Sequence, residues 1–154
     1  MYIPSSDYIR IQAVLPILCV DAVITHEHRC LLLCRRNHPA RGQLWFPGGR
    51  LHKNERIAAA ALRKAFEEVR LHCEFQSILS VEETLFPRVE DMVADAHTVN
   101  VCCHLTVTEM TEIALDSQHE VYQWIDEDEA QELSLHEGVR RPLLLALGVH
   151  SRSN

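Results

Sequence analysis

Several features that mark other classes of protein are missing from this sequence of 154 residues. No apolar run could span a membrane, because the run at residues 13–20 is short and contains Pro16. No basic segment precedes that run, as a signal peptide would require. The 15 Lys and Arg residues are outnumbered by 22 Asp and Glu and form no basic stripe for nucleic acid. These absences predict a protein that binds neither a membrane nor nucleic acid.

Paired cysteines are also lacking. The six cysteines form no CxxC motif, and most lie within apolar runs, where a free cysteine behaves as a small hydrophobic residue. We interpret them as reduced, which predicts a cytoplasmic location. Repeats, linkers and low-complexity tracts are absent too, so residues 1–154 are expected to form one domain with a core of its own.

The patterns that are present predict an α/β (α+β) fold with a mixed β-sheet between helices. Strands are expected at residues 17–25 and 30–34, joined by a turn at 26–29, and again at 75–86, at 99–107 and after His119. Helices are expected at residues 7–14, at 55–69, from Asp126 to Leu133 and at 138–149.

The stretch at residues 45–71 organises the rest of the chain. A Pro-Gly-Gly segment at 47–49 follows the apolar pair Trp45-Phe46, so an extended segment runs into a turn that a ligand can approach closely. From Glu55 onward, apolar residues at helical spacing form one face of a helix. The apolar residues of this face are Ala58, Leu62, Ala65 and Val69.

Two adjacent acids, Glu67 and Glu68, end this helix. Each has a cation four residues earlier, Arg63 and Lys64 respectively, so one interpretation is a solvated surface with ordinary ion pairs. The other is a metal site. Together with Glu55 and a backbone carbonyl of the glycine turn, these carboxylates form an all-oxygen set that suits Mg²⁺ or Mn²⁺.

Arginines surround the glycine turn although the protein is acidic overall. Arg35, Arg36 and Arg41 precede the turn and Arg50 follows it. Such a cluster is either plain surface or a set of bidentate phosphate contacts, and we favour the second interpretation for Arg50. Asp21, which interrupts an apolar strand, is either paired internally or directed at the same site.

The ordered spacing of Gly49, Glu55, Arg63, Glu67-Glu68 and Leu71 resembles the motif of the Nudix hydrolase family. In that family a loop-helix-loop holds a divalent metal against a diphosphate, and the fold is an α/β/α sandwich. The sequence departs from the motif at two positions: Lys64 replaces an acid, and Arg70 replaces a glycine.

Further features resemble one Nudix subgroup, the GDP-mannose mannosyl hydrolases. They are Arg35-Arg36, residues 47–50 and the run from Gln118 to Trp124. The resemblance implies Mg²⁺-dependent hydrolysis of a GDP-sugar, either GDP-mannose or GDP-glucose, at the anomeric carbon, which gives GDP and free hexose.

The same resemblance implies a role for each matching residue. The main-chain oxygen of Gly49, Glu68 and Gln118 would bind Mg²⁺, and His119 would be the base that activates water. Arg36 and Arg50 would stabilise the departing diphosphate, with Arg35 and Asp21 as further substrate contacts. Glu67 leaves room for a second metal, and Thr98 stands where the subgroup has an aromatic phenol.

Two alternatives stay open at this point. One is a conventional Nudix pyrophosphohydrolase that attacks phosphorus in a nucleoside diphosphate-linked substrate. The other is a nucleotide-binding protein of the same fold in which Lys64 has weakened catalysis. A homodimer is compatible with the sequence, which does not decide the oligomeric state.

Overall fold

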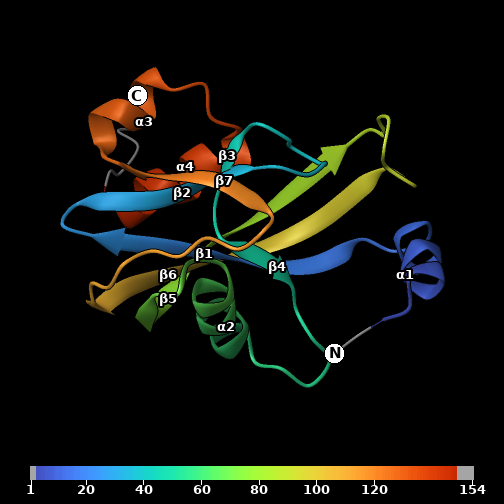
Figure 1. Ribbon diagram of the computed structural model, residues 1–154, viewed down its shortest axis with the longest axis horizontal. Coiled ribbons are helices and arrows are strands. Elements are labelled where there is room, and N and C mark those ends of the chain that lie inside the picture. Colours follow the sequence, from blue (N-terminus) through green and yellow to red (C-terminus); the bar gives the residue numbers. More distant parts are fainter. Residues whose placement is uncertain (1–2, 149–154) are drawn as a thin grey trace.

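The structure is a computed structural model that describes residues 3–148 (Figure 1). Within these residues seven strands form one sheet in the order β3-β2-β1-β6-β5, with β4 paired to β1 and β7 to β2. β1 and β6 run parallel and the other pairs are antiparallel, so the sheet is mixed, as predicted. The strands are β1 (Ile17–His26), β2 (Arg29–Arg35), β3 (Leu44–Trp45), β4 (Gly48–Arg50), β5 (His72–Phe86), β6 (Ala96–Glu109) and β7 (His119–Ile125). The helices are α1 (Ser5–Gln12), α2 (Ile57–Val69), α3 (Glu127–Glu132) and α4 (Glu137–Ala146).

Helices cover both faces of the sheet, with α2 on one side and α3 and α4 on the other (Figure 1). One hydrophobic cluster joins α2 to β1, β2 and β6 through residues that include Val20, Leu31 and Val101. A second cluster joins α3 and α4 to the alternate residues of the same strands, including Leu32 and Cys102. Successive strand residues point to opposite faces, which is why one strand feeds both clusters. This arrangement confirms the predicted α/β/α sandwich.

The helix α2 lies flat on the sheet because its buried face is made of alanines. Ala60, Ala61 and Ala65 are fully buried, and so is Val69. The buried face is thus shifted toward Ala60 and Ala61 from the one the sequence predicts. Small side chains let the helix backbone come close to the strands, which holds its acids near the glycine turn.

At its C-terminus α2 ends on an arginine in a backbone conformation that glycine usually adopts. Arg70 has φ 60°, in the left-handed region, and its backbone N–H donates to the carbonyl oxygen of Phe66. Its guanidinium also lies 5.3 Å from the ring centre of Phe66. The helix therefore closes with a left-handed cap although the glycine of the family motif is missing.

Most predicted elements are confirmed, with shifted ends. β5 and β6 are longer than predicted, since they pair along their whole length across the loop at 87–95. The cap at Asp126 is a complete capping box with Glu129. The last predicted helix was extended to Val149, which lies outside the described residues; α4 ends at Ala146. β3 and β4 were not predicted, because strands of two or three residues carry no periodic pattern.

No helix within residues 3–148 combines the length and the apolar character that a membrane crossing requires. All six cysteines are free thiols, and four of them are buried. The interpretation of the cysteines as small hydrophobic residues is therefore confirmed.

Candidate functional site

A cavity of about 340 Å³ opens between the glycine turn and the ends of β1, β5 and β6. Five of the predicted site residues line it: Asp21, Arg35, Gly49, Arg50 and Gln118. The predicted turn at 47–49, called the glycine turn below, is mostly the short strand β4, because Gly48 and Gly49 pair with β1. This pairing, opposite Cys19, Val20 and Asp21, brings it to the cavity. A side chain at Gly48 would overlap Asp21 Oδ1 and lie 2.7 Å from the carbonyl oxygen of Val20, so this position requires glycine.

A chain of hydrogen bonds forms the floor of the cavity. Asn100 Nδ2 donates to Asp21 Oδ2 at 2.9 Å, and Thr98 Oγ1 donates to Asn100 Oδ1 at 2.5 Å. Thr84 Oγ1 and Thr98 Oγ1 are 2.5 Å apart. Since the single hydroxyl proton of Thr98 points at Asn100, Thr84 must be the donor in that last contact. Every group in the chain then donates toward Asp21, and lone pairs of the two threonines and of ionised Asp21 are left to accept further hydrogen bonds.

Asp21 is buried, with 3% of its surface exposed. Burial raises the pKa of Asp21 to about 7, while the hydrogen bond from Asn100 and the charge of Arg35 oppose this rise. Asp21 is thus neither unsatisfied nor remote from the site: it has an internal partner and also lines the cavity. Both interpretations that the sequence left open apply to it.

One wall of the cavity is aromatic. Trp45 and Phe86 line it, and their rings meet edge to face with centroids 5.9 Å apart. The ring of His136 packs against both of them, with its centroid 5.1 Å from that of Trp45 and 5.5 Å from that of Phe86. This wall offers aromatic surface next to a polar floor, a combination that suits a planar heterocycle.

Of the predicted arginine cluster, the structure brings two members to the cavity. Arg35 lines it and donates from Nε to the carbonyl oxygen of Pro39 at 2.9 Å. The guanidinium of Arg50 lies 5.0 Å from the ring centre of Tyr8. Arg36 and Arg41 are exposed and do not line the cavity. Of the two neighbours that the sequence offers, Arg35 therefore lies against the cavity and Arg36 does not, and the role of each stays a prediction.

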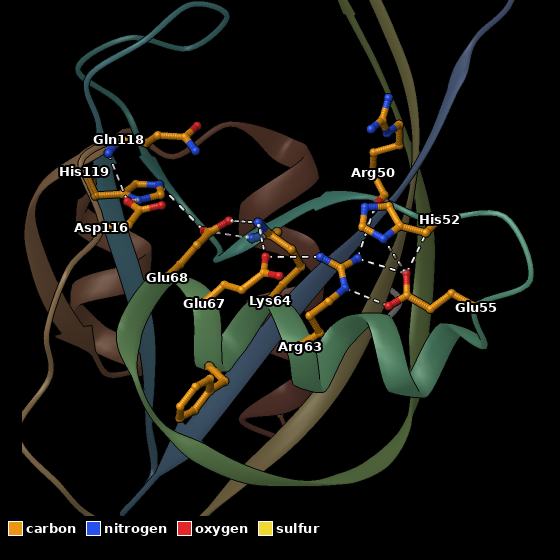
Figure 2. Close-up of polar contacts among 12 residues, drawn as sticks. Arg50, His52, Glu55, Arg63, Lys64, Glu67, Glu68, Asp116, Gln118 and His119 are labelled. Atoms are coloured by element: carbon orange, nitrogen blue, oxygen red, sulfur yellow. Dashed lines mark hydrogen bonds and ion pairs between the residues drawn. The ribbon is translucent and has the colours of Figure 1, made fainter. Parts of the chain in front are cut away.

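Beside the cavity, the two acids of α2 are held by cations (Figure 2). Lys64 Nζ lies 2.5 Å from Glu68 Oε1 and 3.3 Å from Glu67 Oε2. Arg63 also binds Glu67, at 3.1 Å, and Gly48 N–H donates to Glu68 Oε2 at 3.2 Å. Burial raises the pKa of Glu68, an effect that Lys64 opposes. The i,i+4 pairing expected from the sequence is therefore present, and at Glu68 it is buried.

His119 is enclosed between two carboxylates (Figure 2). Its Nδ1 lies 2.7 Å from Asp116 Oδ1 and its Nε2 lies 3.8 Å from Glu68 Oε2. Asp116 also accepts from the backbone N–H of Gln118 at 3.0 Å. Gln118 lines the cavity and is exposed, whereas His119 has 5% of its surface exposed and lies behind it.

Glu55 does not join the other acids, contrary to the expectation of one oxygen set. Arg63 donates to both of its oxygens, at 2.7 Å and 2.9 Å, and His52 N–H donates to it at 3.1 Å. These bonds hold the pKa of Glu55 at about 2. Glu55 therefore ties the start of α2 to the helix and to the loop before it.

The oxygens of Glu67 and Glu68 have the right chemistry for Mg²⁺, but their surroundings do not fit the ion as they stand. Lys64 contacts both carboxylates, and a second cation, Arg63, holds Glu67. Across residues 3–148 no group of three or more His, Cys, Asp or Glu side chains is arranged to hold a metal. A hard divalent cation favours an excess of negative oxygen ligands, and here the ammonium of Lys64 lies between the two carboxylates that would supply them.

Three polar residues of the site were missed from the sequence. Asn100 carried a signal, since it is a polar residue inside an apolar strand, as Asp21 is. Asp116 stands three residues before His119, a spacing that could have been noticed. Thr84 gave no signal, because a threonine in a strand is ordinary.

The comparison with protein families assigns a class to this fold and site. The model described as the NUDIX domain matches residues 15–147, and the chain belongs to the Nudix family. Members of this family generally use divalent metals such as Mg²⁺.

Three characterised relatives show the range of the family. The low-salt glycan biosynthesis protein Agl8 of Haloferax volcanii is 32% identical over 118 residues, which are 76% of this chain and 75% of the relative. The ADP-ribose pyrophosphatase of Methanocaldococcus jannaschii is 33% identical over 66 residues, 43% of this chain and 39% of the relative. The human 8-oxo-dGDP phosphatase NUDT18 is 37% identical over 60 residues, 39% of this chain and 19% of the relative.

Solved structures of the family share the fold at low sequence identity. A MutT protein from Methanosarcina mazei superposes with a TM-score of 0.68 at 16% identity and covers 91% of this chain and 99% of its own. The Escherichia coli dihydroneopterin triphosphate pyrophosphohydrolase superposes with a TM-score of 0.68 at 18% identity, over 86% of this chain and 96% of its own. The Nudix domain of Shewanella oneidensis NrtR, complexed with ADP ribose, gives 0.63 at 20% identity, with 94% and 97% covered.

Proposed function

We propose that this protein hydrolyses a GDP-linked hexose at the anomeric carbon and releases GDP and free sugar. The observation that carries the proposal is the cavity itself, in which a polar floor, an aromatic wall and two guanidinium groups surround one space of about 340 Å³. The first two features suit a nucleobase, and the guanidinium groups suit a diphosphate. The relative Agl8, by its name a protein of glycan biosynthesis, supports a sugar-linked substrate.

The floor favours guanine among the common bases. Lone pairs of Thr84, Thr98 and ionised Asp21 are free to accept hydrogen bonds, because both hydroxyl protons and one amide proton of Asn100 are already directed at the next acceptor. Guanine presents two adjacent donors, N1–H and N2–H₂, on one edge. Adenine has a single donor group there beside an acceptor that would meet another lone pair, and such mismatched buried groups are costly.

The diphosphate is assigned to the arginine side of the cavity. Arg35 and Arg50 are placed by β2 and β4 on the two sides of the glycine turn. Their guanidinium groups would neutralise the charge that builds up on GDP as the glycosidic bond breaks. We propose Arg35 and Arg50 for this role, in place of the pair Arg36 and Arg50.

Water attacks the anomeric carbon in the proposed reaction. A bond forms between the water oxygen and that carbon, the bond to the β-phosphate oxygen breaks with its electron pair leaving on GDP, and a base takes the proton of the water. His119 is the proposed base. Its Nδ1–H is directed at Asp116, which leaves Nε2 as the nitrogen able to accept a proton. Gln118, the residue before it, lines the cavity, whereas His119 itself is buried next to that lining, with Nε2 on the side of Glu68.

The resemblance assigns Mg²⁺ or Mn²⁺ to Gly49, Glu67, Glu68 and Gln118. Because Lys64 already holds Glu67 and Glu68, the proposed reaction contains no step that passes through a metal. Attack at carbon is compatible with this, since it needs a good leaving group and a base and does not need a metal-bound hydroxide on phosphorus.

Hydrolysis in ¹⁸O-labelled water tests the proposal directly, with GDP-mannose and GDP-glucose as substrates and mass spectrometry of the products. The label is expected in the free hexose, with GDP unlabelled. Label in a phosphate product would reject attack at carbon and assign the protein to the second candidate, a conventional pyrophosphohydrolase, which similarity to the M. jannaschii ADP-ribose pyrophosphatase favours.

Nucleotide binding without turnover would favour the third candidate, a nucleotide-binding protein. The observation behind it is that Lys64 neutralises the acids of the family motif. A homodimer and a cytoplasmic location stay predictions, which light scattering and cell fractionation would test.

A further inference from the structure

We propose that Lys64 is a built-in cation that takes the place of the divalent ion at the acids of α2. The protein should therefore bind Mg²⁺ and Mn²⁺ only weakly, and removal of Lys64 should create a metal site. This inference concerns the cation alone and does not depend on which bond the protein breaks.

The position of the ammonium group is the first observation. Lys64 Nζ contacts Glu68 Oε1 at 2.5 Å and Glu67 Oε2 at 3.3 Å, so it bridges both acids (Figure 2). Its side chain is 13% exposed, which is low for a lysine. A lysine head group held in this way is not a solvated surface charge.

The glycine turn is the second observation. A Cβ placed on Gly49 would lie 3.1 Å from Lys64 Cε and 3.5 Å from Lys64 Nζ. The ammonium thus lies between the acids of the helix and the backbone of the turn. That is the space in which helix carboxylates and a turn carbonyl would converge on a metal ion, so a metal and Lys64 compete for one place.

The charge balance is the third observation. Glu68 is 4% exposed and needs a counter-charge to stay ionised in that environment. Lys64 supplies this charge, and Arg63 neutralises Glu67 from the other side. Arg63 is shared with Glu55, so Lys64 is the cation that stands against Glu68 itself, and its positive charge repels a divalent ion from that carboxylate.

The alternative is an ordinary ion pair that a metal displaces without difficulty. The two cases differ in the affinity of the unmodified protein for metal. A built-in cation keeps this affinity low and raises it once the cation is removed. An incidental pair gives a measurable metal site in the protein as it stands.

Mn²⁺ titration followed by electron paramagnetic resonance measures this affinity without any substrate, since the signal of free Mn²⁺ falls when the ion binds. The full chain is compared with Lys64→Glu, which adds a third carboxylate, and with Lys64→Met, which removes the charge and keeps the length. Lys53→Met is the matched control, because Lys53 is the other lysine of the sequence and is exposed in the loop before α2.

The full chain and Lys53→Met are expected to leave the free Mn²⁺ signal unchanged up to about 1 mM. Lys64→Met should bind Mn²⁺ at least about tenfold more tightly than the full chain, and Lys64→Glu more tightly still. Thermal unfolding gives a second readout: Mg²⁺ should raise the Tm of the two Lys64 variants and leave that of the full chain unchanged.

Two results would overturn the proposal. One is a full chain that binds Mn²⁺ as tightly as Lys64→Glu does. The other is a pair of folded Lys64 variants that gain no affinity. If Lys64→Glu fails to fold because three acids repel one another, Lys64→Met decides the question alone. No outcome depends on turnover, so failure here is distinct from failure of the proposed reaction.

Discussion

Arg63 binds both carboxylate oxygens of Glu55, at 2.7 Å from Nε and 2.9 Å from Nη2. The same guanidinium reaches the carbonyl oxygen of Arg50 at 3.4 Å, so one side chain connects the helix α2, the loop before it and the end of the glycine turn. Two residues that the family motif places eight positions apart thus act as a structural brace for the site.

Glu55→Gln should destabilise the fold by about 1–3 kcal/mol at neutral pH, because it removes a bidentate charge-assisted pair. The sign of the pH dependence follows from the lowered pKa of about 2. A carboxylate whose pKa is lower in the folded protein than in the unfolded chain stabilises the fold at any pH above its unfolded-state pKa, which is near 4.3 for a glutamate. This stabilisation is lost as the pH falls toward the folded-state pKa of about 2. Urea unfolding at several pH values measures this. The difference between wild type and Glu55→Gln should shrink as the pH falls from about 5 to 2, and a constant difference would contradict the assigned role.

Asp21 should give a pH dependence of the opposite sign. Its pKa is raised to about 7 by burial, so the folded state holds this proton more firmly than the unfolded chain does. The stability that Asp21 contributes is therefore fully present below about pH 4 and falls by roughly 1 kcal/mol per pH unit until the pH passes about 7. Asp21→Asn keeps an oxygen for Asn100 and carries no charge, so its unfolding free energy should lack this decline. If the unfolding free energies of wild type and Asp21→Asn fall equally with pH between about 4 and 7, Asp21 does not have the raised pKa assigned to it.

His119→Ala should lower kcat by about 10²- to 10⁴-fold and leave substrate binding nearly intact, as expected for a general base. Asp116→Asn tests the positioning of that base, since it removes the partner at 2.7 Å from Nδ1. It should lower kcat less than His119→Ala does and shift the pH profile of kcat. Because His119 is buried, thermal unfolding of both variants must show a folded protein first. An unchanged kcat in folded His119→Ala would leave this histidine without a catalytic role.

Arg50→Gln should weaken the binding of GDP by about tenfold or more, because a charge-assisted contact to phosphate contributes about 1.5–3 kcal/mol. Arg41→Gln is the matched control, since Arg41 is exposed and lies outside the cavity. Isothermal titration with GDP and with guanosine separates the phosphate contribution from that of the base. Equal losses for the two ligands, or for the two variants, would argue against a diphosphate contact at Arg50.

The sequence predicted those parts of the molecule that depend on local pattern. The helix that carries Glu67 and Glu68, the short helix that begins at Asp126 and the alternation in the strands all follow from periods of 3.6 and 2 or from a capping residue. The glycine turn was predicted as a site for the same reason, since Gly48 and Gly49 follow a strand.

The sequence could not predict contacts between residues that lie far apart in the chain and come together only in the folded sheet. Thr84, Thr98 and Asn100 come from two strands that meet only after the sheet has formed, and their hydrogen bonds to one another and to Asp21 have no local signature. The choice between Arg35 and Arg36 depends on which neighbour faces the cavity, and a shift of one residue in a strand reverses that. The pairing of Lys64 with Glu68 was foreseen from its spacing, but its burial against Gly49 was not.

The parallel pairing of β1 and β6 has a consequence for the order of folding. Asp21 and Asn100 are separated by 79 positions in the chain, and the ladder that joins their strands runs from Ile17 opposite Thr98 to Thr25 opposite Thr106. Closing so long a loop costs entropy before any contact is gained, whereas the hairpin of β5 and β6 closes a short one. During synthesis, β2 is available to β1 early, whereas the pairing of β1 with β6 waits until β6 has left the ribosome. The contact between Asp21 and Asn100 in the floor of the cavity therefore forms only after most of the sheet has been synthesised.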